Sequence, residues 1–197
     1  MVRRFDAERP VARTVVERAL ETALHAPSAG FSQGWDFVVL EAAAAREAFW
    51  AATASDGVPD AWLRGVSAAP VLVLCLSDPD TYLDRYAEPD KGWADRDVAR
   101  WPVPYWDVDT GMAALLMLLS AVDQGLGALF FGVPPGAHDA VRRAHGIPAN
   151  RRLVGVVALG YEGERTTSPS VRRGRRARAD VLHWDGFGES GASLTGP

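Results

Sequence analysis

The sequence predicts a single globular domain in which helices alternate with buried strands. Hydrophobic residues make up 48% of the 197 residues, which is enough for a packed core in one domain. Apolar residues recur at helical spacing from Val15 to Leu24, and short apolar runs such as Val71–Leu76 have the length of buried strands. Because no internal repeat or linker stands out, we expect residues 1–197 to form one domain.

The first half of the chain predicts two helices and two strands around a loop. Charged residues separate the apolar ones over 15–24, so this segment is an amphipathic helix that ends before the turn-forming residues of 27–34. A strand is expected over 36–40. The alanine-rich segment 42–54 predicts a second helix, and 71–76 predicts a second buried strand.

The second half begins with a polar segment, 77–106, that contains four prolines and six tryptophans or tyrosines. We expect it to be irregular and to act as a lid-like insertion. A long apolar helix should follow to about Gln124, capped by Asp107 or Asp109 and ended by Gly125. The remaining expected elements are a strand over 128–133, a short helix over 137–144, a strand over 153–159 and an arginine-rich C-terminal extension over 160–197.

Composition and charge narrow the setting in which the chain works. A net charge of −4 gives no reason to expect nucleic acid or an anionic membrane as a partner. Cys75 is the single cysteine and the first residues lack the apolar stretch of a signal peptide, so a reducing, cytoplasmic location is expected. The apolar stretch from Gly111 to Val122 is shorter than the roughly 20 residues that a bilayer requires, and we interpret it as a core helix.

The segment Gly30–Gly34 matches the G-x-S-x-G pattern of serine hydrolases, with Ser32 as nucleophile. That elbow needs a strand before the serine and a helix after it, whereas here the expected helix comes first. A serine hydrolase is therefore a distant alternative. No pattern of metal ligands or of a nucleotide-binding loop stands out, and no metal site is expected.

Two arginine clusters stand out in this acidic chain. One lies in the run 171–178, and the other is Arg3 and Arg4 near the N-terminus. Each is either a solvated charged segment or a phosphate clamp, because guanidinium groups hold phosphate through paired, charge-assisted hydrogen bonds.

Taken together, these segments resemble the nitroreductase family. Arg3-Arg4-Phe5 is similar to the family's R-x-F opening, and residues 26–39 are similar to its A-P-S-x-x-N-x-Q-P-W-x-F-V-V. Asp109-Thr110-Gly111, Gly125 to Gly132 and Arg175-Arg176 follow in the family's order. Nearly the whole chain is covered, and the 26–39 segment is the most specific part.

The resemblance implies an α+β fold of three layers, with a mixed, mainly antiparallel sheet flanked by helices, and an intertwined homodimer. It also implies an FMN-dependent oxidoreductase that passes a hydride from NADPH or NADH through flavin N5 to a small organic acceptor such as a nitroaromatic or a quinone. The flavin carries the chemistry, so no catalytic side chain is expected. The implied cofactor-binding residues are Arg3, Arg4, Pro27, Ser28, Ala29, Gln33, Phe131, Gly132, Arg175 and Arg176, and the hypothetical walls of the substrate pocket are Phe31, Trp93 and Trp106.

Two departures from the family pattern concern the cofactor site. The family usually carries a further arginine a few residues before R-x-F; this sequence begins at Met1, so either one phosphate ligand is missing or the true start lies upstream. Phe31 replaces the loop asparagine, and Gly34 replaces the following proline. These departures motivate one alternative function, a family member that binds flavin for storage or regulation without turning it over.

Overall fold

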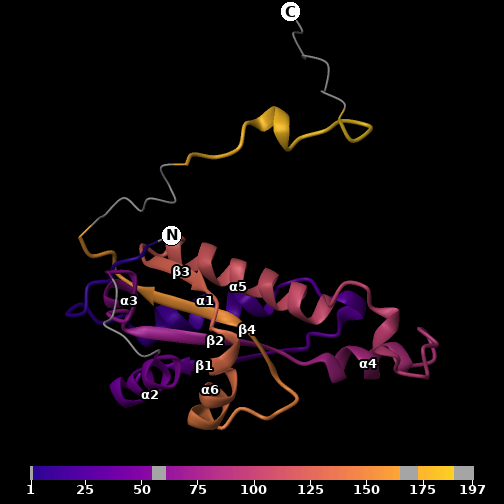
Figure 1. The fold of residues 1–197 in the computed structure, drawn as a ribbon, viewed down its shortest axis with the longest axis horizontal. Helices are drawn as coiled ribbons and strands as arrows, with labels where there is room; N and C mark the ends of the chain where they lie inside the picture. The colour runs from indigo at the N-terminus through magenta and orange to yellow at the C-terminus, as the bar shows by residue number, and fades with distance from the viewer. Residues whose placement is uncertain (1, 55–60, 165–172, 189–197) are drawn as a thin grey trace, which may run out of the picture. The chain divides into compact units, whose positions relative to one another are not determined.

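A four-stranded antiparallel sheet with the strand order β1-β2-β4-β3 is the centre of the fold (Figure 1). The computed structural model describes residues 2–54, 61–164 and 173–188. Residues up to 164 belong to one unit, and residues 173–188 belong to a second unit that is treated by itself. The strands are β1 (Trp35–Leu40), β2 (Val71–Ser77), β3 (Gly127–Phe131) and β4 (Arg152–Gly160).

Both faces of the sheet are apolar, because side chains alternate between two hydrophobic clusters. In β2, Val71, Val73 and Cys75 join one cluster, while the intervening leucines join the other. Helices α1 (Arg13–Leu24) and α5 (Tyr105–Asp123) cover the first face, as Figure 1 shows. Helices α2 (Ala43–Thr53) and α6 (His138–His145) contribute to the cluster on the second.

The expected α+β fold with three layers is confirmed, with one correction to the sheet. The sheet was expected to be mixed, but all three strand pairings between the described residues are antiparallel. The eight helices and strands expected outside 77–106 are present. Their limits mostly differ by one or two residues, and Gly125 follows the end of α5 with a φ of +78°.

The segment 77–106 is more regular than the sequence suggested. It contains α4 (Pro79–Ala87), which begins where the Asp78 side chain accepts a hydrogen bond from the Asp80 N–H. Prolines were expected to interrupt regular structure, but Pro79 occupies the first helical turn, where no backbone N–H is needed. A short helix, α3 (Ala61–Val66), was also missed.

The long helix α5 begins at Tyr105, before the start that a cap at Asp107 or Asp109 implies. The prediction that Asp107 or Asp109 caps it is wrong, because Pro104 is the N-cap residue and both aspartates lie inside the helix. An 18-residue window of the 19-residue helix α5 has a mean hydropathy of 1.2, which by length and composition alone would allow it to cross a membrane. The core helix of a soluble protein passes the same test, and α5 packs one side on the sheet.

The second unit, residues 173–188, has little regular structure of its own. It contains a short 3₁₀ turn, Arg178–Asp180, closed by a hydrogen bond of 2.7 Å from Arg176 Nη2 to the Asp180 carbonyl. Its apolar side chains are largely exposed: Val181, Leu182, Trp184 and Phe187.

Candidate functional site

The loop between α1 and β1, residues 27–34, has a fixed and unusual backbone. Gly30, Phe31 and Gln33 all have left-handed φ values, of 62°, 58° and 54°. Such values strain a residue that has a side chain, so other interactions must hold this conformation. The Ser28 carbonyl accepts the Phe31 N–H at 2.9 Å, and the Ser28 hydroxyl accepts the Gln33 N–H at 3.0 Å. The loop is thus closed on itself by backbone and side-chain hydrogen bonds.

Asp109 ties this loop to two helices. Its carboxylate is buried and accepts the Ala29 N–H at 2.8 Å and the Tyr82 hydroxyl at 2.9 Å. Burial, followed by the hydrogen bond to Asp109, raises the pKa of Tyr82 far above its usual value, so the hydroxyl stays a donor. Asp109 therefore joins the loop, α4 and α5 through a single carboxylate.

Close packing explains the glycine at position 34, where the family has proline. A Cβ there would lie 2.6 Å from Tyr82 Cε2 and 2.9 Å from the Asp78 carbonyl oxygen. Gly30 is also covered, because the Tyr86 ring lies against it and Arg85 Nε donates to its carbonyl at 2.9 Å. α4 is thus packed directly on the loop.

Two side chains of this loop are exposed to solvent in the part of the chain that the structure describes. Phe31 is 75% exposed, and Gln33 is exposed with no hydrogen-bond partner for its amide among the residues that the structure describes. In contrast, the Ser32 hydroxyl donates to the Ala29 carbonyl at 2.7 Å and serves the turn. The serine hydrolase alternative gains no support from this arrangement.

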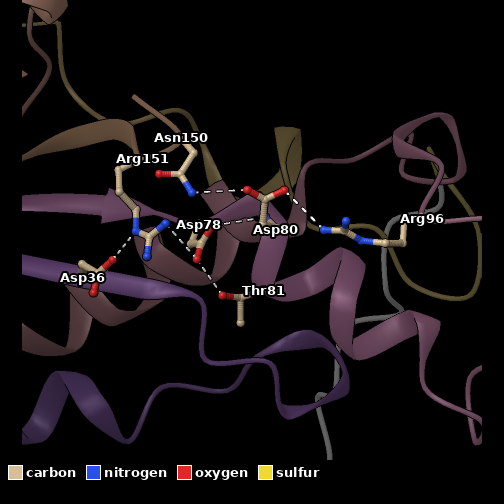
Figure 2. Close-up of polar contacts among 7 residues, drawn as sticks. All are labelled: Asp36, Asp78, Asp80, Thr81, Arg96, Asn150 and Arg151. Carbon is tan, nitrogen blue, oxygen red and sulfur yellow. Dashed lines mark hydrogen bonds and ion pairs between the residues drawn. The ribbon is translucent and has the colours of Figure 1, made fainter. Parts of the chain in front are cut away.

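A polar network fixes the start of α4 to the end of the sheet, as Figure 2 shows. Arg151 pairs with Asp36 at 2.5 Å and with Asp78 at 3.0 Å. Asp78 also accepts the Thr81 hydroxyl at 2.7 Å. Next to it, Asp80 accepts the Asn150 amide at 3.3 Å and pairs with Arg96 at 3.5 Å (Figure 2). Four segments far apart in the chain are therefore held together at this end of the sheet.

The aromatic side chains of 77–106 pack mainly on one another. Trp101 lies at the centre of the cluster, with its ring centroid between 4.6 and 6.1 Å from those of Tyr82, Tyr86, Trp93, Tyr105 and Trp106. Of the two hypothetical pocket walls here, Trp93 is half-buried and Trp106 is only 5% exposed. Trp106 therefore supports the cluster from within, while Trp93 lies nearer its surface.

The N-terminal arginines lie at the opposite end of the sheet. The segment around Arg3 and Arg4 runs between α3 and the chain after β4, with Phe5 N–H donating to the Gly65 carbonyl and Gly163 N–H donating to the Arg4 carbonyl. Val2 N–H donates to Ala128 at the start of β3. β2, which spans the sheet from this end to the other, has seven residues and so measures roughly 20 Å. We call this end the arginine end and the end with residues 27–34 the loop end.

Phe131 and Gly132, two other predicted cofactor residues, are not brought to the 27–34 loop within one chain. Phe131 ends β3, and its ring stacks on Trp50 with 5.8 Å between centroids, while the exposed Gly132 follows it. β3 and β1 are opposite edges of the sheet, three strand spacings or roughly 14 Å apart. Arg175 and Arg176 belong to the separate unit 173–188.

Comparison with known proteins identifies the family. The profile of the nitroreductase family matches residues 1–161. A protein of Archaeoglobus fulgidus named "Putative NADH dehydrogenase/NAD(P)H nitroreductase" is 30% identical over 161 residues, which are 80% of this chain and 78% of the relative. The chain belongs to the nitroreductase family.

Solved structures of nitroreductases share the fold. A nitroreductase family protein of Clostridium difficile 630 superposes with a TM-score of 0.70 at 20% identity, over 94% of this chain and 93% of that one. A family member from Streptococcus pneumoniae also gives 0.70, at 21% identity over 93% and 94% of the two chains. An FMN-dependent nitroreductase of Clostridium difficile R20291 gives 0.66, at 19% identity over 94% of both.

The chain has residues of the right chemistry for each part of FMN, but they lie at two different ends of the sheet. A flavin needs cations for its phosphate, polar groups at the ring edge and an apolar surface against the ring. Arg3 and Arg4 are at the arginine end, whereas Gln33 and Phe31 offer an amide and an exposed aromatic ring at the loop end. The two sets are separated by about the length of β2.

The residues that hold the loop in place were not predicted from the sequence. Asp109 was read only as a helix cap and a family motif, and Tyr82 and Arg85 were not singled out, because their roles depend on contacts between distant segments. One signal was available: an aspartate followed by proline, Asp78-Pro79, is a typical helix start.

Proposed function

We propose that this protein is an FMN-dependent oxidoreductase that uses NADPH or NADH to reduce a small organic acceptor, such as a nitroaromatic or a quinone. Family membership supports this proposal, as do the names of the Archaeoglobus and Clostridium relatives. The observation that carries it is the 27–34 loop, whose strained backbone is fixed by Asp109 while Phe31 and Gln33 stay exposed. Strain maintained by buried contacts is typical of functional sites.

The chain's own residues would bind and orient the reactants. Bound FMN would supply the redox chemistry, which is hydride transfer between a reduced nicotinamide and the acceptor. The Gln33 amide can hydrogen-bond the polar edge of the ring, and Phe31 can cover an aromatic acceptor. Trp93 is a further candidate for the pocket wall, and arginines would hold the phosphate.

We also propose that the working form is a homodimer. Arg3 and Arg4 lie at the opposite end of the sheet from the loop, so one cofactor can meet both most readily if a second chain supplies one of them. An exposed apolar stripe on α5 offers a surface for that second chain, since its members recur at intervals of three and four residues: Met112, Leu115, Leu119 and Val122. Leu119 and Val122 are 58% and 61% exposed.

The proposed activity is tested by the visible absorption spectrum of the purified protein, loaded with FMN and freed of excess. We expect a flavin spectrum that bleaches when NADPH or NADH is added without oxygen and returns when a nitroaromatic or quinone is added. A spectrum that persists with both nucleotides would contradict the proposal and favour flavin storage or regulation. Absence of bound flavin would contradict both.

The proposed dimer is tested by sedimentation equilibrium of the wild type and of Leu119→Glu. A charge in the stripe should dissociate the dimer and lower FMN affinity together. The control, Glu17→Gln, changes an exposed position on another helix, α1, and should leave the mass unchanged. A wild-type protein that stays monomeric at micromolar concentration with FMN bound would contradict the dimer.

A further inference from the structure

We infer that Phe31 is a specificity-determining residue, which selects acceptors with a second, fused aromatic ring over acceptors with a single ring. The 1,4-naphthoquinones and the 1,4-benzoquinones are one such pair of acceptor classes. The inference rests on the proposed function, because it names the kind of acceptor that the same site prefers.

The side chain of Phe31 gains little from burial in the folded chain. It is 75% exposed and belongs to neither hydrophobic cluster. Among the described residues up to 164, no other large hydrophobic side chain is as exposed, and Val122 comes next at 61%. Burial is what makes an apolar side chain stabilise a fold, so a phenyl ring left in solvent contributes little to stability.

The backbone of Phe31 adds a cost. Its φ of 58° is left-handed, a region in which the Cβ of most residues crowds the backbone and which asparagine and aspartate tolerate best after glycine. The other non-glycine residues with positive φ in the described segments are all polar: Gln33, Arg96 and Asp185. Neither burial nor backbone preference therefore accounts for a phenylalanine here, whereas contact with a ligand does.

The loop presents this ring from a fixed backbone. The Phe31 N–H donates to the Ser28 carbonyl at 2.9 Å. The residue before it, Gly30, is covered by the Tyr86 ring, and its carbonyl accepts Arg85 Nε at 2.9 Å. Because the loop is ordered by these contacts, a ligand that stacks on Phe31 does not have to fix the loop conformation first.

The surroundings of the ring suit a small aromatic ligand better than a protein surface. Gly30, Ser32 and Gln33, its neighbours in the sequence, bring no apolar side chain, so Phe31 does not continue into an apolar patch along the loop. Aromatic rings attract one another in offset-stacked and edge-to-face contacts. The reducible part of an acceptor has to face the cofactor, so a second ring is the part that is left for Phe31 to contact.

The test compares 1,4-naphthoquinone with 1,4-benzoquinone, using the full chain loaded with FMN and kept free of oxygen. In both reactions NADPH or NADH loses a hydride and becomes the oxidised nucleotide. The quinone gains the two electrons and the hydrogen of that hydride, takes one further proton from the solvent and becomes the hydroquinone. Phe31→Asn should lower kcat/KM for naphthoquinone about 3- to 10-fold more than for benzoquinone, because it removes the ring and suits the backbone.

Two measurements do not depend on turnover. Calorimetric titration with 1-naphthamide and benzamide, which are not reduced, should show weaker binding to Phe31→Asn for naphthamide only. The melting temperature of the variant should rise by up to about 4 °C, because asparagine relieves backbone strain and no buried contact is lost.

Two control variants define what the ring contributes. Phe31→Leu keeps an apolar side chain without a ring, so its loss of preference for naphthoquinone should be intermediate. Leu24→Asn removes another exposed apolar side chain, at the end of α1, and should leave the preference unchanged.

The contrary outcomes can be told apart. Equal changes for the two quinones and for the two amides would overturn the inference and leave the proposed function intact. A lower melting temperature for Phe31→Asn would overturn it, because Phe31 would then support the fold. Loss of a dimer in that variant, seen by sedimentation equilibrium, would also overturn it and assign the ring to contact with a second chain. A wild-type protein that reduces neither quinone with either nucleotide would overturn the proposed function, and the inference with it.

Discussion

The two ends of the sheet differ in how their charged side chains are paired. At the loop end, carboxylates are paired within the chain: Asp109 accepts two hydrogen bonds, and Asp36 and Asp78 share Arg151. At the arginine end, Arg4 borders a hollow beside α3 and has a weak, exposed partner in Glu164. The loop end is cross-linked by short contacts to buried carboxylates, and the arginine end carries the exposed Arg4–Glu164 pair.

This difference indicates that the two ends would hold different parts of a cofactor. Paired groups at the loop end fix backbone geometry, which suits the positioning of a flavin ring whose reactive atom must be oriented. Cations at the arginine end suit a phosphate, whose binding depends on charge more than on orientation. Substitutions at the loop end should therefore lower stability, whereas those at the arginine end should mainly lower FMN affinity.

The largest expected effect comes from Asp109→Ala. This change leaves the Ala29 N–H and the buried Tyr82 hydroxyl without their acceptor, so we expect a loss of about 3 kcal/mol in the free energy of unfolding. Urea denaturation would measure it. Asp123→Ala, at the exposed end of the same helix, should change stability by less than about 0.5 kcal/mol. Equal effects for the two variants would show that the buried carboxylate is unimportant.

Gly34→Ala should lower the free energy of unfolding by about 1–3 kcal/mol, because the new methyl group would overlap Tyr82 and the Asp78 carbonyl. Thermal unfolding with a matched Gly136→Ala control would measure it, since a Cβ at 136 meets no atom within 4 Å. Tolerance of alanine at position 34 would mean that α4 is not packed rigidly on the loop.

Gly65→Ala applies the same change at the arginine end. The methyl group would lie 2.2 Å from the Arg3 carbonyl oxygen and push that backbone away from α3, so we expect a loss of stability at least as large as at position 34 and an FMN affinity that falls more than the affinity for riboflavin, which lacks the phosphate. Titration with the two flavins would separate these effects. If both affinities fell equally, the contrast between the two ends would be lost.

Arg151→Gln should lower the free energy of unfolding by about 1 kcal/mol, since it removes the partner of Asp36 and of the buried Asp78. Asp78 would keep its hydrogen bonds from Thr81 and the Asp80 N–H, which limits the loss. Urea denaturation at low and high salt would measure the effect, and the difference from wild type should shrink with added salt. A difference that grows with salt would contradict a role in pairing charges.

The fold was largely predictable because it depends on local patterns. Apolar alternation and helical spacing placed β2, β4 and α1 within two residues of their observed limits. α4 was missed because prolines were counted as interruptions without regard to position, although Pro79 directly after Asp78 favours a helix start.

The candidate site was less predictable because its contacts join distant segments. Residues 27–34 could be recognised from their family pattern, but the role of Asp109 depends on a contact 80 residues away. The contact of the N-terminal segment with α3 likewise depends on Gly65, whose missing side chain leaves room for the Arg3 carbonyl. Neither relation leaves a spacing or composition signal in the sequence.

The smallest expected effect is a pH dependence at the loop end. Arg85 donates to Asp90 through two nitrogens, at 2.7 and 2.8 Å, and this hydrogen bonding lowers the pKa of Asp90 below its usual value near 3.8. A lowered folded-state pKa contributes stability above the unfolded-state pKa, and this contribution is lost as the pH falls through the folded-state value. Asp90→Asn should therefore lower the melting temperature slightly at pH 7, and the melting temperatures of the two proteins should converge below about pH 3.8.

Glu164→Gln, at the arginine end, should show no comparable difference at pH 7, because its partner Arg4 lies 3.6 Å away and both side chains are exposed. A constant difference between wild type and Asp90→Asn at every pH would mean that the charge of Asp90 does not stabilise α4, and the loop end would then depend on its buried contacts alone.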